Sequence, residues 1–272
     1  MVSIIAGKVA DRYRCFEDRV GNTLRHRAWE ELDERLICGI TSADAGDFRV
    51  PESKTTQLLD TYGTLAMSCG FNCVSVPSQV HGTTVSILND MGNSLEGPDF
   101  HFSWAGRVDG QVTQTSGCLL ACTAADCVPV YLWHPESNSL GLLHAGWRGV
   151  SGGILDVGLK TIRSFGFGRG REIGSESRMG IRLHLGPAIC GFCYEVDRQV
   201  LQQLGRPGNR AFLDLRGVLL QQALEGGVEE DLITVSAQCT RCGPEKLHSY
   251  RRDGQKSGRM AAFLGLRSVA TM

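Results

Sequence analysis

The chain has 272 residues, and its 42% hydrophobic content is enough to fill the core of one large globular domain or two small ones. Its 28 basic and 29 acidic residues leave a net charge of −1, so no overall field draws the protein to nucleic acid or to an anionic membrane. No apolar run approaches the roughly eighteen residues of a membrane span. The apolar start at residues 1–6 is also too short for a signal peptide. We therefore expect a cytoplasmic protein that binds neither nucleic acid nor membrane.

Taken in chain order, short apolar runs predict strands, and apolar residues three and four apart predict helices. The expected elements are a helix at 54–67, strands at 73–76, 83–88, 118–123, 128–133 and 140–144, a helix at 153–165, a strand at 181–185, helices at 197–204 and 213–224, and strands at 232–235 and 261–266. Adjacent strand runs broken by separated helices favour a layered α+β fold over strict βαβ alternation. Because no repeat or low-complexity tract divides the chain, we expect a single domain over residues 1–272, with flexible glycine-rich stretches at 166–180 and 205–209.

The chain contains eleven cysteines and no export signal, which indicates a reducing compartment. Most of these thiols are expected to be small core residues. Cys118 and Cys122 lie in a mainly apolar run, and we expect both to serve only in packing.

Three short segments each place one metal-binding side chain beside glycine or proline, namely His81, Cys127 and His144. Imidazole and thiolate are ligands that zinc prefers, and three protein ligands leave the fourth position open, as catalytic zinc requires. These residues lie 46 and 17 positions apart, whereas structural zinc sites usually show closely paired ligands. The spacing therefore favours a catalytic site.

Two CxxC pairs, Cys190 with Cys193 and Cys239 with Cys242, are an alternative place for zinc. The 45 residues between the pairs are far more than a compact zinc ribbon allows. The sequence therefore disfavours a four-cysteine site.

Phosphate binding is predicted near Arg148, because the glycine-rich segment 149–153 precedes an expected helix and free N–H groups at a helix start bind anions. A plain tight turn is the alternative for this segment. Arg251, Arg252 and Arg259 add positive charge near the C-terminus, with solvated surface as the alternative.

A series of short motifs resembles the laccase-domain family, once named multicopper polyphenol oxidase and now regarded as purine nucleoside phosphorylase-like. In order, the motifs are Gln-Val-His-Gly at 79–82, Asp-Gly-Gln-Val-Thr at 109–113, Ala-Asp-Cys-Val-Pro-Val at 125–130, His-Ala-Gly-Trp-Arg-Gly at 144–149, Gly-Pro-Ala-Ile at 186–189, Tyr-Glu-Val at 194–196, Cys-Thr at 239–240, and Ser-Tyr-Arg-Arg-Asp-Gly at 249–254 followed by Gly-Arg at 258–259. The resemblance spans roughly residues 36–266. It implies an α+β sandwich of mixed sheets with outer helices.

The resemblance also implies that zinc is held by His81, Cys127 and His144. It implies phosphorolysis of adenosine, inosine and S-methyl-5′-thioadenosine to the free base and (methylthio)ribose 1-phosphate, with adenosine deamination as a second activity. Zinc lowers the pKa of its bound water to roughly 7, which suits deamination. Purine nucleosides and phosphate would be the partners of a monomer or small homo-oligomer.

Phosphorolysis also needs groups that stabilise charge on phosphate and on the departing base. We expect Arg148, together with Arg251 and Arg252, to contact phosphate. Asp126, Asp253 and Glu195 are candidates for protonating the leaving base.

The copper-oxidase name does not fit the histidine count. A blue-copper site with a trinuclear cluster needs about ten histidines, commonly in His-x-His pairs. The chain has seven histidines and no such pair, which excludes a four-copper oxidase but not adventitious copper at the three ligands.

Two other functions remain open. Cys127 as a thiolate nucleophile with His144 as its base would make a cysteine hydrolase or deamidase, although His81 has no role there. A metal-buffering or partner-binding protein is the other, because the family's Asn-Arg pair before its first zinc histidine is missing. Residues 38–47 read Cys-Gly-Ile-Thr-Ser-Ala-Asp-Ala-Gly-Asp, and no Asn-Arg follows before His81. Its absence removes an expected ribose or phosphate contact.

Overall fold

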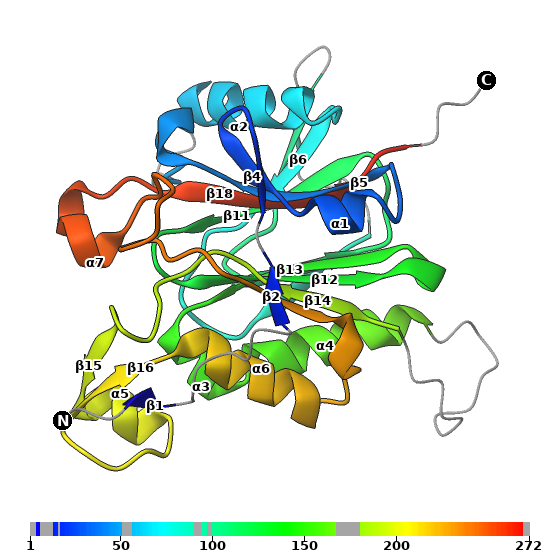
Figure 1. Cartoon of the computed structure of the whole chain (residues 1–272). Coiled ribbons are helices and arrows are strands. Elements are labelled where there is room, and N and C mark those ends of the chain that lie inside the picture. The colour runs from blue at the N-terminus through cyan, green and yellow to red at the C-terminus, as the bar shows by residue number, and fades with distance from the viewer. Residues whose placement is uncertain are drawn as a thin grey trace.

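The computed structural model describes residues 4–5, 13–15, 17–50, 56–89, 94–96, 100–166 and 180–268. In that part of the chain, two large mixed sheets lie face to face between outer helices (Figure 1). The upper sheet is covered by α2 (Thr56–Ser68), and the lower sheet by α3 (Trp147–Gly152), α4 (Ile154–Gly166) and α6 (Leu215–Glu225). The predicted α+β sandwich of mixed sheets with outer helices is confirmed.

The upper sheet has eight strands in the order β3-β4-β5-β18-β11-β6-β9-β8. Their bounds are β3 (Asp18–Val20), β4 (Thr23–Arg25), β5 (Leu36–Thr41), β18 (Met260–Leu266), β11 (Cys118–Ala124), β6 (Cys73–Val76), β9 (His101–Trp104) and β8 (Ser94–Glu96). β6 runs parallel to both of its neighbours, β11 and β9. The remaining pairs in this sheet are antiparallel.

The lower sheet has seven strands in the order β2-β17-β14-β12-β13-β10-β7. Their bounds are β2 (Arg14–Cys15), β17 (Ile233–Ser236), β14 (Arg182–Leu185), β12 (Val128–His134), β13 (Ser139–Ala145), β10 (Gly110–Thr113) and β7 (Val85–Leu88). A small third sheet contains β1 (Ile4–Ile5), β16 (Arg210–Leu213) and β15 (Glu195–Asp197). The short helices are α1 (Arg27–Glu30), α5 (Arg198–Gln203) and α7 (Tyr250–Asp253).

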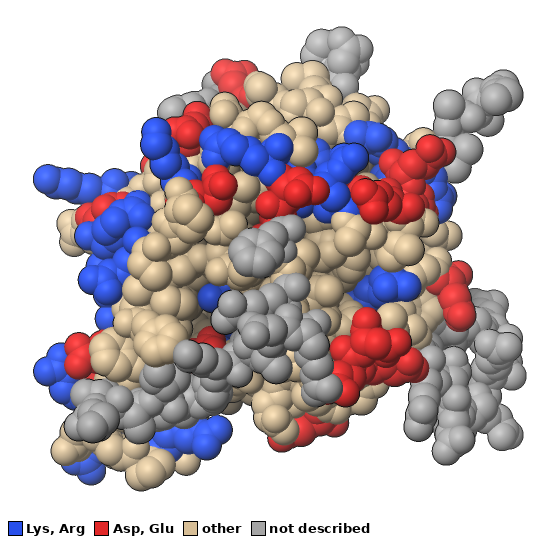
Figure 2. All heavy atoms as spheres, in the orientation of Figure 1, with Lys and Arg blue, Asp and Glu red and all other residues tan. Residues whose placement is uncertain are grey.

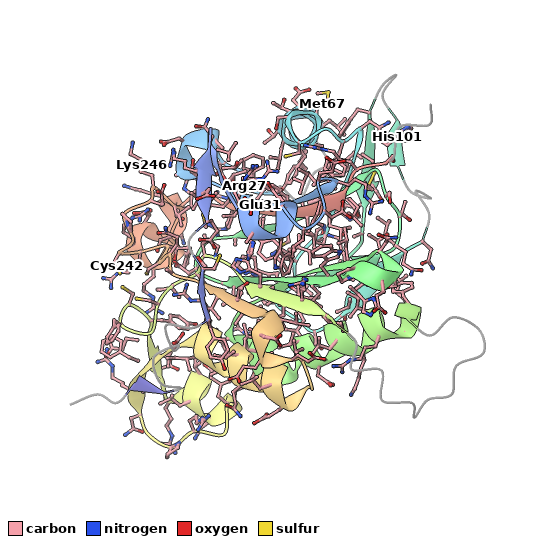
Figure 3. All side chains as sticks on the ribbon, turned by 45° about the vertical axis from the view of Figure 1, so that its right-hand side comes forward. Arg27, Glu31, Met67, His101, Cys242 and Lys246 are labelled. Atoms are coloured by element: carbon pink, nitrogen blue, oxygen red, sulfur yellow. A yellow bond between two sulfur atoms is a disulfide. The ribbon has the colours of Figure 1, made fainter. Side chains whose placement is uncertain are left out.

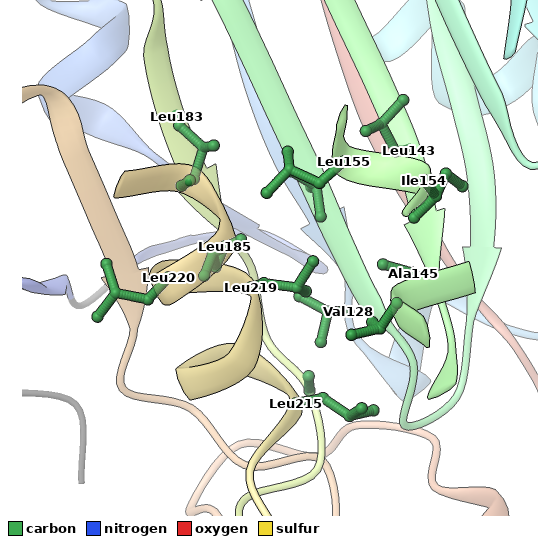
Figure 4. Packing of buried hydrophobic residues seen from close by; sticks show 14 of the residues in the cluster. Val128, Leu143, Ala145, Ile154, Leu155, Leu183, Leu185, Leu215, Leu219 and Leu220 are labelled. Carbon is green, nitrogen blue, oxygen red and sulfur yellow. The ribbon is translucent and has the colours of Figure 1, made fainter. Parts of the chain in front are cut away.

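The central strands read as almost continuous apolar runs because both of their faces are buried. In β11, Leu119 packs in the core beneath α2, whereas Leu120 packs in the core between the two sheets. In β13, Leu142 lies between the sheets, whereas Leu143 and Ala145 belong to the core shared with the lower helices (Figure 4). Alternate side chains of one strand therefore fill two different cores.

All eight predicted strands and all four predicted helices are present, with ends that shift by up to two residues in the described part. The missed elements include β5, β9 and β10, and the short helix α3. The glycine-rich stretch at 166–180 lies almost entirely outside the described residues, and 205–209 forms the link between α5 and β16. Among the described helices, none is both long and apolar enough to cross a membrane.

Cys118 differs from its expected role as a packing residue. The parallel register of β11 and β6 places Cys118 directly beside Cys73, and a disulfide joins the two residues. Cys122 is a buried free thiol in the core between the sheets, as expected. Strand spacing alone could not show the pairing, because Cys73 and Cys118 lie 45 positions apart in the sequence.

Candidate active site

The links that follow two parallel strands carry the first two predicted metal ligands. His81 lies between β6 and β7, and Cys127 lies between β11 and β12. Both links pass from the upper sheet to the lower sheet. Because β6 and β11 are parallel neighbours, their links leave the same edge of the sheet. The third ligand, His144, is near the end of β13 and pairs with Pro129 of β12.

The structure brings the three predicted ligands together. The ligand atoms of His81, Cys127 and His144 all lie within 4.8 Å of one another. The two imidazole rings meet edge to face, with centroids 4.8 Å apart. His144 is buried, Cys127 is partly buried and His81 is exposed. The cluster therefore extends from the interior of the protein to its surface.

Two residues of these links adopt a backbone conformation that is rare outside glycine. His81 has φ of 59°, and Asp126, directly before Cys127, has φ of 95°. Such strained positions gather at functional sites and persist only where the surroundings fix them. Here both residues belong to the two links that deliver the ligands.

Asp109 fixes the His81 link and orients His144. Its carboxylate accepts N–H hydrogen bonds from Val80 at 3.1 Å, His81 at 2.9 Å and Gly82 at 2.7 Å. It also accepts a hydrogen bond from His144 Nδ1 at 2.9 Å, which leaves Nε2 as the nitrogen available to a metal. The sequence motif at 109–113 contained Asp109 but suggested no role for it. The role becomes visible only when β10 pairs with β13.

The charges of the cluster shift the pKa values of its members. Burial alone would raise the pKa of Cys127, but the charge of His144 and hydrogen bonds from His144 and His81 lower it to about 6. Burial opposes protonation of His144, but the Cys127 thiolate and Asp109 raise its pKa to about 9. Each group therefore favours the charged form of the other, thiolate at Cys127 and imidazolium at His144.

Little room is left for a side chain at Gly146, the N-cap of α3, beside the ligands. A Cβ on Gly146 would lie 3.0 Å from Cys127 Sγ and 3.2 Å from His81 Cδ2. The glycine-rich segment 149–153, directly before α4, forms most of α3 and its left-handed C-cap, Gly153, and phosphate binding there stays a prediction. The Val150 N–H already donates to Gly146 O at 2.9 Å.

A cavity of about 990 Å³ adjoins the three ligands. Five arginines line it, namely Arg49, Arg107, Arg148, Arg251 and Arg259, together with the aromatic residues Trp147, Tyr194 and Tyr250. Among the described residues that line the cavity, Asp126 carries the single carboxylate. Figure 2 shows Lys and Arg side chains gathered on the side of the molecule where α7 lies. The cavity therefore concentrates positive charge in a protein of nearly neutral net charge.

Asp126 forms no ion pair with these arginines among the described residues, and both of its carboxylate oxygens accept hydrogen bonds from uncharged donors. One accepts from Thr240 Oγ1 at 2.6 Å, and the other from the Arg251 backbone N–H at 2.6 Å. The Arg148 guanidinium lies 4.3 Å from the ring centroid of Trp147. No carboxylate forms an ion pair with Arg148 in the part of the chain that the structure describes. Arg148 can therefore bind an anion without losing an existing partner.

The structure separates the other two predicted phosphate contacts. Arg251 lines the cavity and donates to Glu195 O at 2.7 Å. Arg252 does not line it, because its guanidinium pairs with Asp253 at 2.8 Å and donates to Thr240 O at 3.1 Å. Sequence reasoning missed Arg49 and Arg107, which lie in connecting segments outside helices and strands and belong to none of the motifs.

The other two candidates for protonating the leaving base, Asp253 and Glu195, both form ion pairs. Asp253 forms the ion pair with Arg252, and Glu195 forms another with Arg210 at 2.9 Å. Neither Asp253 nor Glu195 is among the cavity-lining residues. Together with the two hydrogen bonds of Asp126, these pairings give all three predicted acids a structural partner.

The fold and the site together define a layered α+β protein with a candidate metal centre beside a cavity. The chain belongs to the family described as multi-copper polyphenol oxidoreductase laccase, whose sequence profile matches residues 52–267. The purine nucleoside phosphorylase YlmD of Geobacillus stearothermophilus is 38% identical over 209 residues, which are 71% of this chain and 72% of that protein. The adenosine deaminase RL5 of an unknown prokaryotic organism is 28% identical over 225 residues, covering 77% and 81% of the two chains. The crystal structure of YlmD from G. stearothermophilus has a TM-score of 0.73 and 28% identity, covering 93% of this chain and 99% of that chain.

The family description implies a multi-copper site, but the arrangement of the histidines does not fit one. All seven histidines lie in the described part of the chain, but only His81 and His144 line the cavity. His26 and His184 form a separate buried cluster with Cys15, in which Thr234 hydrogen-bonds to both imidazoles. Two histidines and one cysteine can hold one metal ion, but not a set of four coppers.

Proposed function

We propose that the protein is a zinc-dependent purine nucleoside enzyme. It would cleave adenosine, inosine and S-methyl-5′-thioadenosine with phosphate and would also deaminate adenosine. One observation carries the proposal: the three candidate metal ligands and five arginines line the same cavity. The names of the two relatives, a purine nucleoside phosphorylase and an adenosine deaminase, support the choice of substrate. The cytoplasmic location and a monomeric or small homo-oligomeric state stay predictions.

His81, Cys127 and His144 would hold the zinc ion. Their donor set of two imidazoles and one thiolate suits zinc and leaves one position open. The low pKa of Cys127, about 6, favours the thiolate that a metal needs. Zinc bound there would act as a Lewis acid and would lower the pKa of a bound water to roughly 7.

The side chains of the cavity would bind and orient the other two reactants. Arg148, with Arg251 beside it, would hold phosphate through charge-assisted hydrogen bonds. The rings of Trp147 and Tyr194 offer flat apolar surfaces for a purine base. In phosphorolysis a phosphate oxygen forms a bond to the ribose C1′ while the bond from C1′ to the purine nitrogen breaks. The base leaves with the electron pair of the broken bond and would take up a proton from water, and the arginines would stabilise the charge on phosphate.

A cysteine hydrolase or deamidase is the second candidate, because Cys127 and His144 each favour the charged form of the other. Their pKa values of about 6 and about 9 suit a thiolate nucleophile beside a protonated imidazole. This function would need no phosphate, and it would leave the five arginines without a role.

The test is incubation of the purified protein with inosine, with and without phosphate, followed by quantification of hypoxanthine and ribose 1-phosphate. We expect both products only when phosphate is present. Arg148→Ala should raise the KM for phosphate at least roughly tenfold, since it removes a charge-assisted contact worth about 1.5–3 kcal/mol. Arg27→Ala is the control, because Arg27 lies on α1 outside the cavity. Hypoxanthine with free ribose in the absence of phosphate would instead indicate hydrolysis, and zinc-loaded protein without any product would overturn the proposal.

A further inference from the structure

The two CxxC pairs, which the sequence separates, meet in the folded chain. The sulfur atoms of Cys190, Cys193, Cys239 and Cys242 all lie within 4.8 Å of one another. The sequence-based argument against a four-cysteine site is therefore wrong in its geometry. We call these four residues the thiol cluster.

Sheet topology explains why the pairs meet across 45 intervening residues. One pair follows β14 and the other follows β17, and these strands are parallel neighbours in the lower sheet. Beyond the strand ends, Ala188 and Cys239 form a further parallel bridge, and the Thr240 N–H donates to Ala188 O at 3.2 Å. The carboxyl ends of parallel neighbouring strands lie at the same edge of a sheet. The two CxxC turns that follow these strands therefore lie side by side.

The backbone of both turns is arranged around sulfur. The Cys190 N–H donates to Cys239 Sγ at 3.3 Å, and the Cys242 N–H donates to the same sulfur at 3.5 Å. Hydrogen bonds to a thiolate favour its charged form. The turn after Cys239 also requires Gly243, because a Cβ there would lie 2.4 Å from Cys239 O. A loop that donates N–H groups to sulfur and closes with glycine fits a thiolate ligand better than a packing thiol.

The sulfur spacing fits a tetrahedral metal site and not a disulfide. Cys190 Sγ and Cys242 Sγ are 3.8 Å apart. Four sulfurs at about 2.3 Å from zinc lie about 3.8 Å from one another in a regular tetrahedron, whereas a disulfide bond is about 2.05 Å long. All four cysteines are free. Cys193 and Cys239 are buried, and Cys242 is exposed at the outer edge of the molecule (Figure 3), so an ion could enter from solvent.

We propose that the thiol cluster binds a second zinc ion, with all four cysteines as ligands and no open position. None of the four lines the arginine-rich cavity, so this is a structural site that goes beyond the function proposed above. It does not depend on zinc at His81, Cys127 and His144.

This second zinc would stabilise one wall of the cavity. Directly after Cys193, Tyr194 lines the cavity, and the next carbonyl, Glu195 O, accepts from Arg251 Nη1 at 2.7 Å. Directly after Cys239, Thr240 donates to Asp126 at 2.6 Å. Joining the two turns through one ion would therefore hold cavity-lining residues from two distant segments.

The experiment counts zinc and its sulfur ligands in protein produced without a histidine tag in zinc-supplemented medium. Mass spectrometry of the metal content should give two zinc ions per chain for the wild type. Cys190→Ser/Cys242→Ser should retain one, and so should Cys127→Ala. Cys69→Ser is the control and should retain two, because Cys69 is a free, buried thiol outside the metal-ligating clusters.

X-ray absorption at the zinc edge identifies which site is occupied, and it needs no variant that might fail to fold. The zinc that remains in Cys127→Ala should have four sulfur ligands. In the wild type, a single zinc with one sulfur ligand would overturn this inference and leave the active-site zinc intact. A single zinc with four sulfurs would support it and refute zinc at the active site. An intact-mass loss of about 2 Da per cysteine pair beyond that of the Cys73–Cys118 disulfide, with no zinc at the cluster, would show disulfides there and would also overturn the inference.

Discussion

Asp109 contributes to the candidate metal centre without being one of its predicted ligands. One carboxylate accepts three backbone N–H groups from residues 80–82 and the Nδ1 hydrogen of His144. Burial opposes ionisation of Asp109, but the hydrogen bonds from His144 and Gly82 keep its pKa below the usual range. It therefore acts as a charged anchor for both the strained His81 link and the orientation of His144.

Asp109→Asn tests this role at the scale of one residue. The amide keeps one acceptor oxygen, so it cannot accept all four hydrogen bonds, and the His81 link should loosen. We expect zinc affinity to fall about 10–100-fold, and the free energy of unfolding to fall by about 1–3 kcal/mol. Competition with a chelator, in Cys190→Ser/Cys242→Ser protein so that the thiol cluster does not contribute, measures the affinity.

Asp253→Asn is the matched control for that change. Asp253 makes its ion pair with Arg252 and does not line the cavity, so zinc affinity should be unaltered. Equal zinc affinity in Asp109→Asn and in the control would show that the carboxylate does not position the ligands.

At the scale of the element, the approach of α4 to β13 depends on Gly158. A Cβ there would lie 2.6 Å from Leu143 Cδ1. Leu143 cannot move away easily, because its side chain is fully buried in the core shared with the lower helices. Overpacking of this kind costs about 1–3 kcal/mol, which exceeds the roughly 1 kcal/mol of helix propensity that alanine adds. The net change is the difference of these two effects, so Gly158→Ala should lower the free energy of unfolding by up to about 2 kcal/mol.

Gly63 in α2 provides the opposite expectation for the same substitution. Its Cβ would meet only Phe100, at an ordinary contact distance of 3.4 Å. Gly63→Ala should therefore stabilise the protein, by up to about 1 kcal/mol. Urea denaturation of both variants measures the two changes in the free energy of unfolding. Shifts of the same sign in both would mean that packing against β13 does not decide the effect.

The sequence predicted those elements whose residues are strongly apolar on one or both faces. The run from Val128 to His134 and the heptad-like spacing of α4 are visible without neighbours. β10 was missed because its four residues, Gly110–Thr113, include polar Gln111 and Thr113, which are buried only because their side chains find partners on other strands. Polar residues can be buried when they form long-range hydrogen bonds. Such residues do not show the apolar pattern from which a strand is predicted.

The same limit applies to the whole molecule and to its sites. The three ligands could be proposed from their chemistry, because histidine and cysteine beside glycine already suggest metal binding. The thiol cluster could not, since it depends on β14 and β17 being parallel neighbours. The inward position of Arg49 and Arg107 depends on loops whose path no periodicity shows. Residue chemistry thus suggested candidates, and sheet order decided which of them meet.

At the scale of the whole molecule, the candidate active site should also join the two sheets. His81 and Cys127 lie on links that pass from the upper to the lower sheet, whereas His144 belongs to the lower sheet itself. A metal ion shared by these side chains binds the folded state only, because the unfolded chain does not bring them together. Free zinc at 100 times its Kd would add about 2.7 kcal/mol of stability, which raises Tm by roughly 5–10 °C in a chain of this size.

Thermal unfolding with and without a chelator measures this contribution. In Cys190→Ser/Cys242→Ser protein, where the thiol cluster cannot bind zinc, the chelator should lower Tm by that roughly 5–10 °C. Adding Cys127→Ala removes one of three ligands, so the chelator should then have almost no effect. If the chelator lowers Tm equally with and without Cys127, the stabilising ion lies elsewhere. If it lowers Tm in neither protein, no metal at this site joins the sheets, and their contact depends only on the apolar core between them.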